Sequence, residues 1–213
     1  SANSDVFNVF YNNGDGTLGG RVSMAVCDYP TDVEVFDVDN DNDLDIVTLC
    51  YTADRLVVHK QTPQGTFEQH QSKATTEDLE DMTHGDFNGD GFQDIAIVES
   101  EHDRLIVYMN DGQGTYNCHE NCTHETIGLA YAIKAADMNG DGILDLVLSS
   151  TVRHGVVHFG LGNGNFSEGQ SYGSSASSVG VAPADVNGDG MMDLITIRGS
   201  SVAYINRRQC GEY

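Results

Sequence analysis

The sequence predicts an all-β fold: a β-propeller-type array of four-stranded blades, about four of them, preceded by half a blade. Three observations support this prediction. A nine-residue acidic motif occurs four times at steps of 49, 51 and 48 residues, a glycine-rich motif keeps the same spacing, and short apolar runs fill the intervals. No run shows helical periodicity over the roughly 11 residues that a helix would need.

Each repeating unit is expected to hold four strands, with the acidic motif between the first and second and the glycine turn between the third and fourth. In the second unit, apolar and β-branched residues place the strands at 79–86, 94–100, 104–110 and 116–127. The third unit repeats the pattern at 130–137, 145–150 and 155–161. The strand residues expected to pack between sheets include Ile95, Ile97, Leu146, Val147, Leu194 and Ile195.

In this interpretation the chain is a single domain over 1–213. Its units are a half-blade at 1–28 and blades at 29–77, 78–128, 129–176 and 177–213. The half-blade supplies a third and a fourth strand, and the last unit ends with a third strand at 201–206. If the fourth strand of the half-blade paired with the third strand of the last unit, the ring would close and one strand would be left over. A spare strand is an edge with which another chain can pair.

The acidic motifs begin at residues 37, 86, 137 and 185, and the second reads DFNGDGFQD. Side chains at positions 1, 3, 5 and 9 are Asp or Asn, and position 7 can offer its backbone carbonyl. Converging oxygen ligands, about six to eight of them, are what Ca²⁺ prefers. The predicted ligands of about four Ca²⁺ sites are Asp37, Asp39, Asp41, Asp43 and Asp45; Asp86, Asn88, Asp90, Phe92 and Asp94; Asp137, Asn139, Asp141, Ile143 and Asp145; and Asp185, Asn187, Asp189, Met191 and Asp193.

Turn formation alone is the simpler explanation of one such loop, because Asp, Asn and Gly dominate turns. Four loops in register, each ending in Asp before an apolar run, favour calcium binding. Position 6 is glycine in three loops, where a tight turn needs a positive φ, and Asn42 replaces it in the first. No helix is expected beside the loops and position 12 is never Glu, so an EF-hand is excluded.

The chain carries 33 acidic residues against 10 Lys and Arg, a formal net charge of −23. Such a surface repels nucleic acid and anionic lipid, so we expect neither as a partner. No apolar run approaches the roughly 20 residues of a membrane helix, so no membrane insertion is expected. Sequons at Asn121 and Asn165 are candidates for glycosylation, and with the cysteines they favour an extracellular, secreted or cell-surface protein.

Five cysteines are an odd number. Cys27 precedes the first strand of its unit and Cys50 ends the second. Because these strands run antiparallel, the two cysteines are expected to be neighbours and can form a disulfide. Cys210 is then left over, either free or linked to another chain.

A second cysteine pair lies in the segment CHENCTH. A disulfide between Cys118 and Cys122 closes a small loop and is the favoured interpretation. The alternative is a zinc cluster in which His119 and His124 join the two thiolates.

Other candidate sites are weaker. His154 and His158 lie four residues apart on an expected strand and share a face, either as half of a metal site or as packing residues. His84 precedes the second acidic loop. The motif H-E-x-x-H and the P-loop are both missing, and a non-catalytic protein is expected.

The pattern D-x-[DN]-x-D-G-x-x-D before a β run, followed by G-x-G-x-F, resembles the FG-GAP/VCBS repeats of integrin-α-type β-propellers. The resemblance extends from Val6 to about Asn206. It implies a calcium-bearing propeller, usually extracellular, that serves in adhesion, ligand binding or carbohydrate binding.

Two functions are therefore expected. The first is an extracellular, calcium-stabilised binding or adhesion module, lectin-like and non-catalytic, that recognises carbohydrate or protein. The alternative is a structural subunit of an extracellular filament or oligomer, in which unpaired terminal strands join copies of the chain.

Overall fold

The computed structural model describes residues 5–118, 122–173, 177–197, 204 and 205, and all regular secondary structure within them is β. Among these residues no helix is long and apolar enough to span a membrane. Every strand pairs antiparallel with its neighbours.

The strands form five sheets in chain order. The N-terminal hairpin consists of β1 (Val6–Asn12) and β2 (Leu18–Ala25). Sheet 1 consists of β3 (Pro30–Phe36), β4 (Asp45–Cys50), β5 (Arg55–Gln61) and β6 (Phe67–Ala74). Sheet 2 consists of β7 (Leu79–Gly85), β8 (Asp94–Glu99) and β9 (Arg104–Asn110), with β10 (Tyr116–Asn117) and β11 (Thr123–Glu125) both paired to β9.

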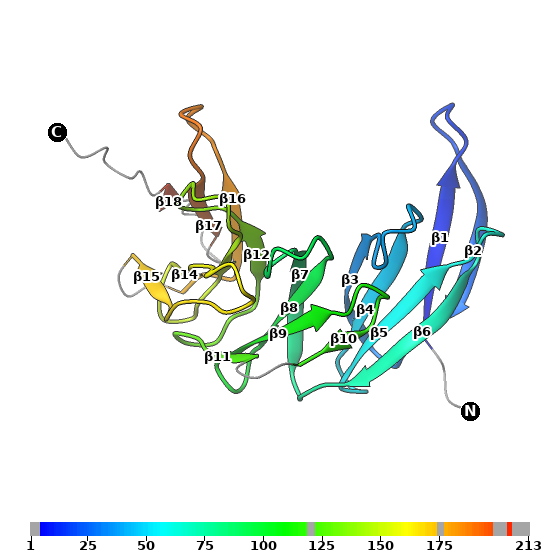
Figure 1. Cartoon of the computed structure of the whole chain (residues 1–213), viewed down its shortest axis with the longest axis horizontal. Coiled ribbons are helices and arrows are strands. Elements are labelled where there is room, and N and C mark those ends of the chain that lie inside the picture. Colours follow the sequence, from blue (N-terminus) through cyan, green and yellow to red (C-terminus); the bar gives the residue numbers. More distant parts are fainter. Residues whose placement is uncertain (1–4, 119–121, 174–176, 198–203, 206–213) are drawn as a thin grey trace.

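Sheet 3 consists of β12 (Ile133–Ala136), β13 (Asp145–Leu148), β14 (Gly155–His158) and β15 (Gln170–Tyr172). Sheet 4 consists of β16 (Gly180–Ala184), β17 (Asp193–Ile197) and β18 (Tyr204–Ile205). The sheets follow one another along a curved array, with the N-terminal hairpin at one end and sheet 4 at the other (Figure 1).

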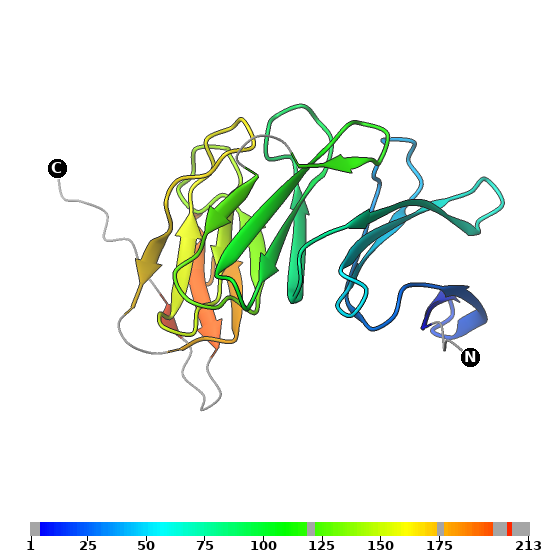
Figure 2. The same cartoon turned by 90° about the horizontal axis from the view of Figure 1, so that it is seen from below.

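The ends of the array do not close a ring. Within the described residues, β1 and β2 pair only with each other, and β17 pairs with β16 and β18. Figure 2 shows the hairpin beside sheet 1, far from sheet 4. The ring closure considered from the sequence, which would pair these first and last strands, is therefore not found among the described residues.

Apolar side chains on the middle strands of each sheet build the core between neighbouring sheets. All residues of β4 and β8 are buried because these strands have neighbours on both edges and packed layers on both faces. One cluster lies between sheets 1 and 2, a second between sheets 2 and 3, and a smaller third between sheets 3 and 4. Of the six predicted core residues, five are buried and Ile195 is half-buried.

The fourth strand expected over 116–127 is divided into two short strands. β10 and β11 flank the disulfide between Cys118 and Cys122, and both pair with β9. A covalent loop of this size cannot stay in an extended ladder, so the chain leaves the sheet and returns to it. The remaining strands of the second unit lie where they were expected, to within one residue at their C-terminal ends.

Candidate metal centres in the acidic loops

Each acidic loop joins the first and second strands of its sheet, and its first aspartate holds the loop in shape. In sheet 2, Asp86 Oδ1 accepts hydrogen bonds from the N–H groups of Gly89 (2.7 Å) and Asp90 (3.1 Å). Its Oδ2 accepts one from Gly91 at 2.9 Å. The first aspartates of the third and fourth loops accept the same set of bonds.

The backbone turns back at positions 4 and 6 of the loop. In the second loop φ is 78° at Gly89 and 88° at Gly91, and in the first loop it is 59° at Asn40 and 70° at Asn42. Glycine adopts these angles freely, and Asn tolerates them better than most residues. The positive φ predicted for position 6 is confirmed. The positive φ at position 4 was not predicted, although position 4 is glycine in three loops.

The last aspartate of the loop accepts hydrogen bonds from two other segments of its sheet. Asp94 is fully buried, and its Oδ2 accepts a hydrogen bond from Phe87 N–H (3.1 Å) while its Oδ1 accepts one from Asn110 N–H (2.8 Å). Asp45 and Asp145 make the corresponding pairs of bonds. A carboxylate accepts at more than two positions, so these groups can still face a cation.

The first and last aspartates of the motif have different electrostatic surroundings. In the second loop, burial raises the pKa of the last aspartate, Asp94, to about 6, against the hydrogen bonds from Asn110 and Phe87. In the fourth loop, hydrogen bonding by the N–H of Gly190 lowers the pKa of the first aspartate, Asp185. A divalent cation would favour the ionised form of both, because it adds positive charge beside each carboxylate.

The predicted side-chain ligands at positions 3 and 5 turn toward each other. Asn88 Nδ2 donates to Asp90 Oδ2 at 2.9 Å, and Phe92 N–H donates to Asp90 Oδ1 at 2.9 Å. The third loop repeats both contacts with Asn139, Asp141 and Ile143.

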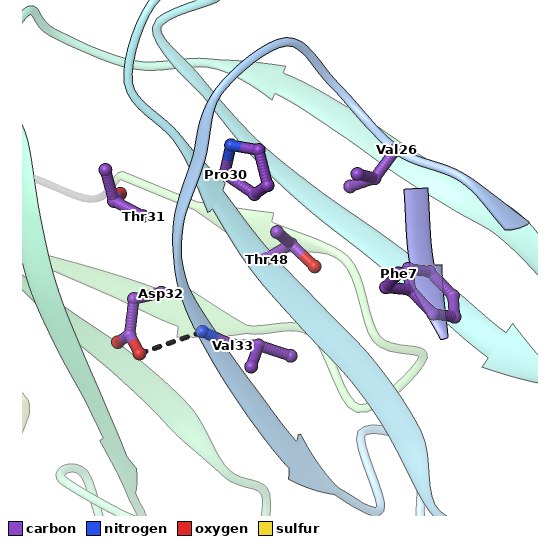
Figure 3. A pocket seen from close by; sticks show the side chains of 7 residues that line it. All are labelled: Phe7, Val26, Pro30, Thr31, Asp32, Val33 and Thr48. Atoms are coloured by element: carbon purple, nitrogen blue, oxygen red, sulfur yellow. Dashed lines mark hydrogen bonds between the residues drawn. The ribbon is translucent and has the colours of Figure 1, made fainter. Parts of the chain in front are cut away.

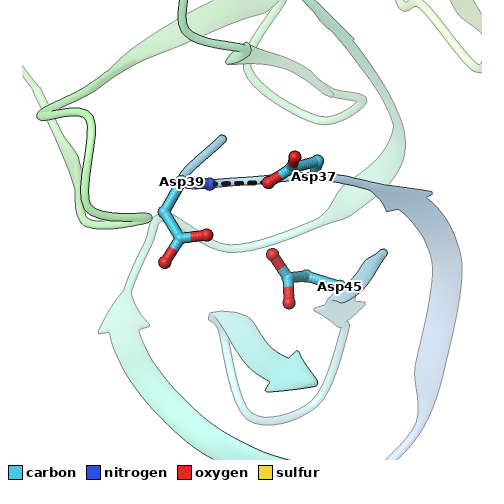
Figure 4. Close-up of side chains that lie close together, drawn as sticks. All are labelled: Asp37, Asp39 and Asp45. Carbon is cyan, nitrogen blue, oxygen red and sulfur yellow. Dashed lines mark hydrogen bonds between the residues drawn. The ribbon is translucent and has the colours of Figure 1, made fainter. Parts of the chain in front are cut away.

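The first loop is the most acidic. Oxygen atoms of Asp37, Asp39 and Asp45 lie within 4.8 Å of one another (Figure 4). Asp39 Oδ1 is buried and has no hydrogen-bond partner among the described residues, whereas its Oδ2 lies 2.6 Å from Lys60 Nζ. An unpartnered buried carboxylate oxygen within a group of carboxylates fits a hard divalent cation such as Ca²⁺.

The acidic loops also hold neighbouring sheets together. Position 2 is apolar in every loop, and Val38 and Phe87 are buried there. Asn110 Nδ2 in the glycine turn of sheet 2 donates to Val38 O at 2.8 Å, and Gly164 N–H in the turn of sheet 3 donates to Phe87 O at 2.9 Å. An added Cβ at Gly114 would lie 2.6 Å from Val38 Cγ2, so this turn requires glycine. The acidic motif and the glycine-rich motif share one spacing because an acidic loop contacts the glycine turn of the next sheet.

Both predicted disulfides are present. Cys27 and Cys50 connect the end of the hairpin to β4, and Cys118 and Cys122 close the loop between β10 and β11. The zinc cluster considered for CHENCTH is therefore wrong, because both of its thiols are oxidised. His119 and Cys210 lie outside the described residues.

The other candidates are placed as follows. His84 stacks on Phe36 with ring centroids 4.2 Å apart, so it is a packing residue. His154 and His158 are both buried. Asn165 is half-buried and its Nδ2 donates to a neighbouring side chain, and glycosylation there stays a prediction. The other sequon residue, Asn121, lies outside the described residues.

An apolar hollow of about 250 Å³ separates the N-terminal hairpin from β3 and β4. Figure 3 shows Phe7 and Val26 facing Pro30, Val33 and Thr48 across it. It is lined mostly by carbon, so it suits an apolar side chain rather than an ion.

Comparison with known proteins agrees with the repeat pattern. The family model described as FG-GAP-like repeat matches residues 86–148 and 137–196, which together make up just over half of the chain. No curated protein sequence matches the chain.

Two solved structures are similar in fold. One is BBS1N in complex with ARL6DN, soaked with lead, with a TM-score of 0.55 and 10% identity over 79% of this chain and 50% of that one. The other is the V. cholerae biofilm matrix protein Bap1, with a TM-score of 0.50 and 17% identity over 91% of this chain and 34% of that one. The chain thus spans half or less of the length of either. At these identities the likeness concerns the fold alone.

The matched segments contain the second, third and fourth acidic loops, all of sheet 3, and the strands β8 to β11 and β16. The chain belongs to the family of FG-GAP-like repeat proteins.

Proposed function

We propose that the chain is a calcium-stabilised, non-catalytic binding module of propeller-type blades that works outside the cell. The observation that carries this proposal is the first loop, where three carboxylates converge and a buried oxygen of Asp39 has no described partner. The repetition of the motif in four sheets and the two disulfides support it.

Calcium would act where the array is joined. The first and second loops each contact the glycine turn of the next sheet. These two loops also touch each other, since Asn40 Nδ2 donates to Gly91 O at 3.2 Å. Without a cation the carboxylates of a loop repel one another, and this repulsion works against the contacts between sheets. Ions bound at Asp37, Asp86, Asp137 and Asp185 and the other predicted ligands would remove it.

The partner proposed is a protein or a carbohydrate. The similar BBS1N structure is a complex with another protein, and the similar Bap1 is a biofilm matrix protein. The apolar hollow beside Val33 offers a place for a protein side chain. The strongly negative surface favours partners that are neutral or basic.

Calcium content and melting temperature test the proposal. We expect excess chelator to lower the melting temperature, because an ion that binds the folded state stabilises it. Asp90→Asn should lose one bound Ca²⁺. Glu77→Gln is the matched control, since it removes one negative charge from an exposed position just before β7, at the opposite end of this strand from the second acidic loop. An unchanged melt in chelator, or full calcium content in Asp90→Asn, would refute the calcium role. The calcium-loaded chain would then be screened on a glycan array and against extracellular proteins.

The exposed faces at the two ends of the array support a second function, that of a structural subunit. Val33 and Val35 on β3 are 54% and 52% exposed, whereas Met82, one repeat later than Val33, is fully buried. At the other end Ile197 is 57% exposed, whereas its counterpart Leu49 is fully buried. Inside the array each such face is covered by the neighbouring sheet.

A second copy could cover both faces at once. Sheet 4 of one copy would pack on sheet 1 of the next, as successive sheets pack within the chain. Such a heterologous contact does not close unless the rotation fits, so it builds a filament or a ring. Light scattering with Ca²⁺ should then give a mass above that of the monomer.

Variants with a charged residue in an end face distinguish the structural subunit from the binding module. Ile197→Asp should give a monomer, whereas Leu161→Asp, at a residue that is also 57% exposed, should not. A monomeric wild-type protein would contradict the structural role and leave the binding module as the function.

A further inference from the structure

Two histidines from separate parts of the chain line one cleft. His124 lies on β11 of sheet 2, and His158 ends β14 of sheet 3. The cleft between these sheets has a volume of about 550 Å³ and is mostly polar. Its other lining residues come from 123–127 and 166–169.

The protonation state of His158 follows from its contacts. Its Nδ1 lies 3.1 Å from Ser167 O, and a carbonyl oxygen only accepts, so Nδ1 carries the proton. Burial lowers the pKa of His158, so the ring is neutral near pH 7. Its Nε2 is therefore a bare lone pair. The residue is fully buried, and this Nε2 has no hydrogen-bond partner among the described residues.

His124 presents the same feature from the other side of the cleft. Its Nε2 is also buried without a hydrogen-bond partner in the described ranges, and burial lowers its pKa. The ring packs edge-on against Phe166, with centroids 5.8 Å apart. The backbone beneath it is fixed, because β11 pairs with β9 and the Cys122 carbonyl accepts a bond from Val107 N–H at 2.7 Å.

A buried acceptor without a donor destabilises the folded state, so two in one cleft require an explanation. An imidazole whose Nδ1–H is held by a backbone carbonyl, with Nε2 left free, has the arrangement of a metal-ligating histidine. Glu125 and Glu168 also line the cleft and are exposed. In the described structure no three of these two glutamates and the two histidines bring ligand atoms within 4.8 Å of one another, so a carboxylate would have to turn toward the histidines to supply an oxygen ligand. Nitrogen donors favour zinc-like ions over calcium.

We propose that this cleft binds one divalent transition-metal ion of the Zn²⁺ class through the Nε2 atoms of His124 and His158. The site is separate from the acidic loops in position and in donor type. It places an ion between β11 of sheet 2 and β14 of sheet 3, so metal binding would fix these two strands relative to each other. A bridging water molecule is the simpler occupant, and the test is designed to distinguish the two.

Zinc titration of the calcium-saturated wild-type chain is the first experiment, because calcium keeps the acidic loops occupied. Calorimetry should detect one Zn²⁺ equivalent. Long-range ¹H–¹⁵N spectra of the histidine rings should show the Nε2 signals of His124 and His158 shifting together. This readout needs no substitution, so it does not depend on whether a variant folds.

Substitutions then assign the ligands. His124→Gln and His158→Gln should each weaken zinc binding by about tenfold or more, whereas the exposed His70→Gln should bind as the wild type does. Gly169→Ala tests the geometry without removing a ligand, because a Cβ there would lie 2.9 Å from His158 Nε2. It should also weaken binding.

Two results would overturn the proposal. Zinc affinity unchanged in both His→Gln variants would show that the ion binds elsewhere. Ring nitrogens of His124 and His158 that do not shift in excess Zn²⁺ would mean that the cleft holds only water.

Discussion

Lys60 sets the first acidic loop apart from the other three. Its Nζ lies 2.6 Å from Asp39 Oδ2, and the two side chains are 23% and 19% exposed. In the second loop the corresponding residues are Asn88 and Met109, whose Nδ2 and sulfur atoms are 3.8 Å apart. The first loop thus has two more carboxylates than the second, at Asp39 and Asp43, and one ammonium group beside Asp39. We predict that Lys60→Met destabilises the calcium-free protein and that the added change Asp39→Asn restores it.

The size of the effect follows from the partial burial of the pair. An exposed ion pair contributes about 0.2–1 kcal/mol, and removing one partner of a buried pair costs about 3–5 kcal/mol. A pair that is about one-fifth exposed lies between these limits, so Lys60→Met should cost about 2 kcal/mol. For a chain of this size that corresponds to about 4–8 °C in melting temperature. The double variant gives the first loop the neutral pair of the second, so it should melt close to the wild type.

Thermal melting followed by circular dichroism, in chelator and in excess calcium, measures these effects. The loss in Lys60→Met should be smaller with calcium, because the bound ion supplies the positive charge that the variant lacks. A Lys60→Met protein that melts with the wild type in chelator would refute the reasoning. So would a double variant as unstable as the single one, since the unpaired Asp39 would then not be the cause.

Three further predictions follow. The double variant Cys27→Ser, Cys50→Ser should lower the free energy of unfolding by about 3 kcal/mol. It should also leave the N-terminal hairpin unprotected in hydrogen exchange, because the disulfide and few other contacts hold this hairpin on the array. Retained protection would contradict this. Asn42→Gly should stabilise the protein by about 0.5–1 kcal/mol in denaturant melts, because glycine adopts the φ of 70° without strain. Burial raises the folded-state pKa of Asp81 to about 6, so its contribution to stability should be lost as pH rises from about 4 to 6. Asp81→Asn should flatten that part of the pH profile, and an unchanged profile would count against it.

The repeat pattern was enough to predict the β-rich architecture and most strands. The motif spacing determines the strand order within each sheet, since a loop of nine residues can join only neighbouring strands. The positive φ at Asn42 was also predictable, because position 6 is glycine in the other three loops. These features depend on short stretches of chain, and the sequence reports such stretches directly.

Features that depend on contacts between repeats were missed. The apolar residue at position 2, such as Val38 or Phe87, was visible in all four loops, but its role appears only when the glycine turn of the next sheet is placed beside it. The Lys60–Asp39 pair was missed although it lies within one sheet, because its partners are 21 residues apart in the sequence. His124 was considered with His119 and His158 with His154, because sequence distance does not reveal that sheets 2 and 3 bring His124 and His158 to one cleft.

The same dependence on neighbours explains where the array is weakest. An inner sheet such as sheet 2 is covered by a neighbouring sheet on both faces. Sheet 4 has one face covered by sheet 3, and sheet 1 has one face covered by sheet 2 and only the hairpin beside the other. In a repeat array, stability is approximately the sum of each unit and its interfaces, so a unit with one interface opens first. Val33 and Ile197 are exposed because no described sheet packs over them. The proposed cation binding in the loops and the Cys27–Cys50 disulfide are therefore expected to matter most at the ends, where apolar packing contributes least.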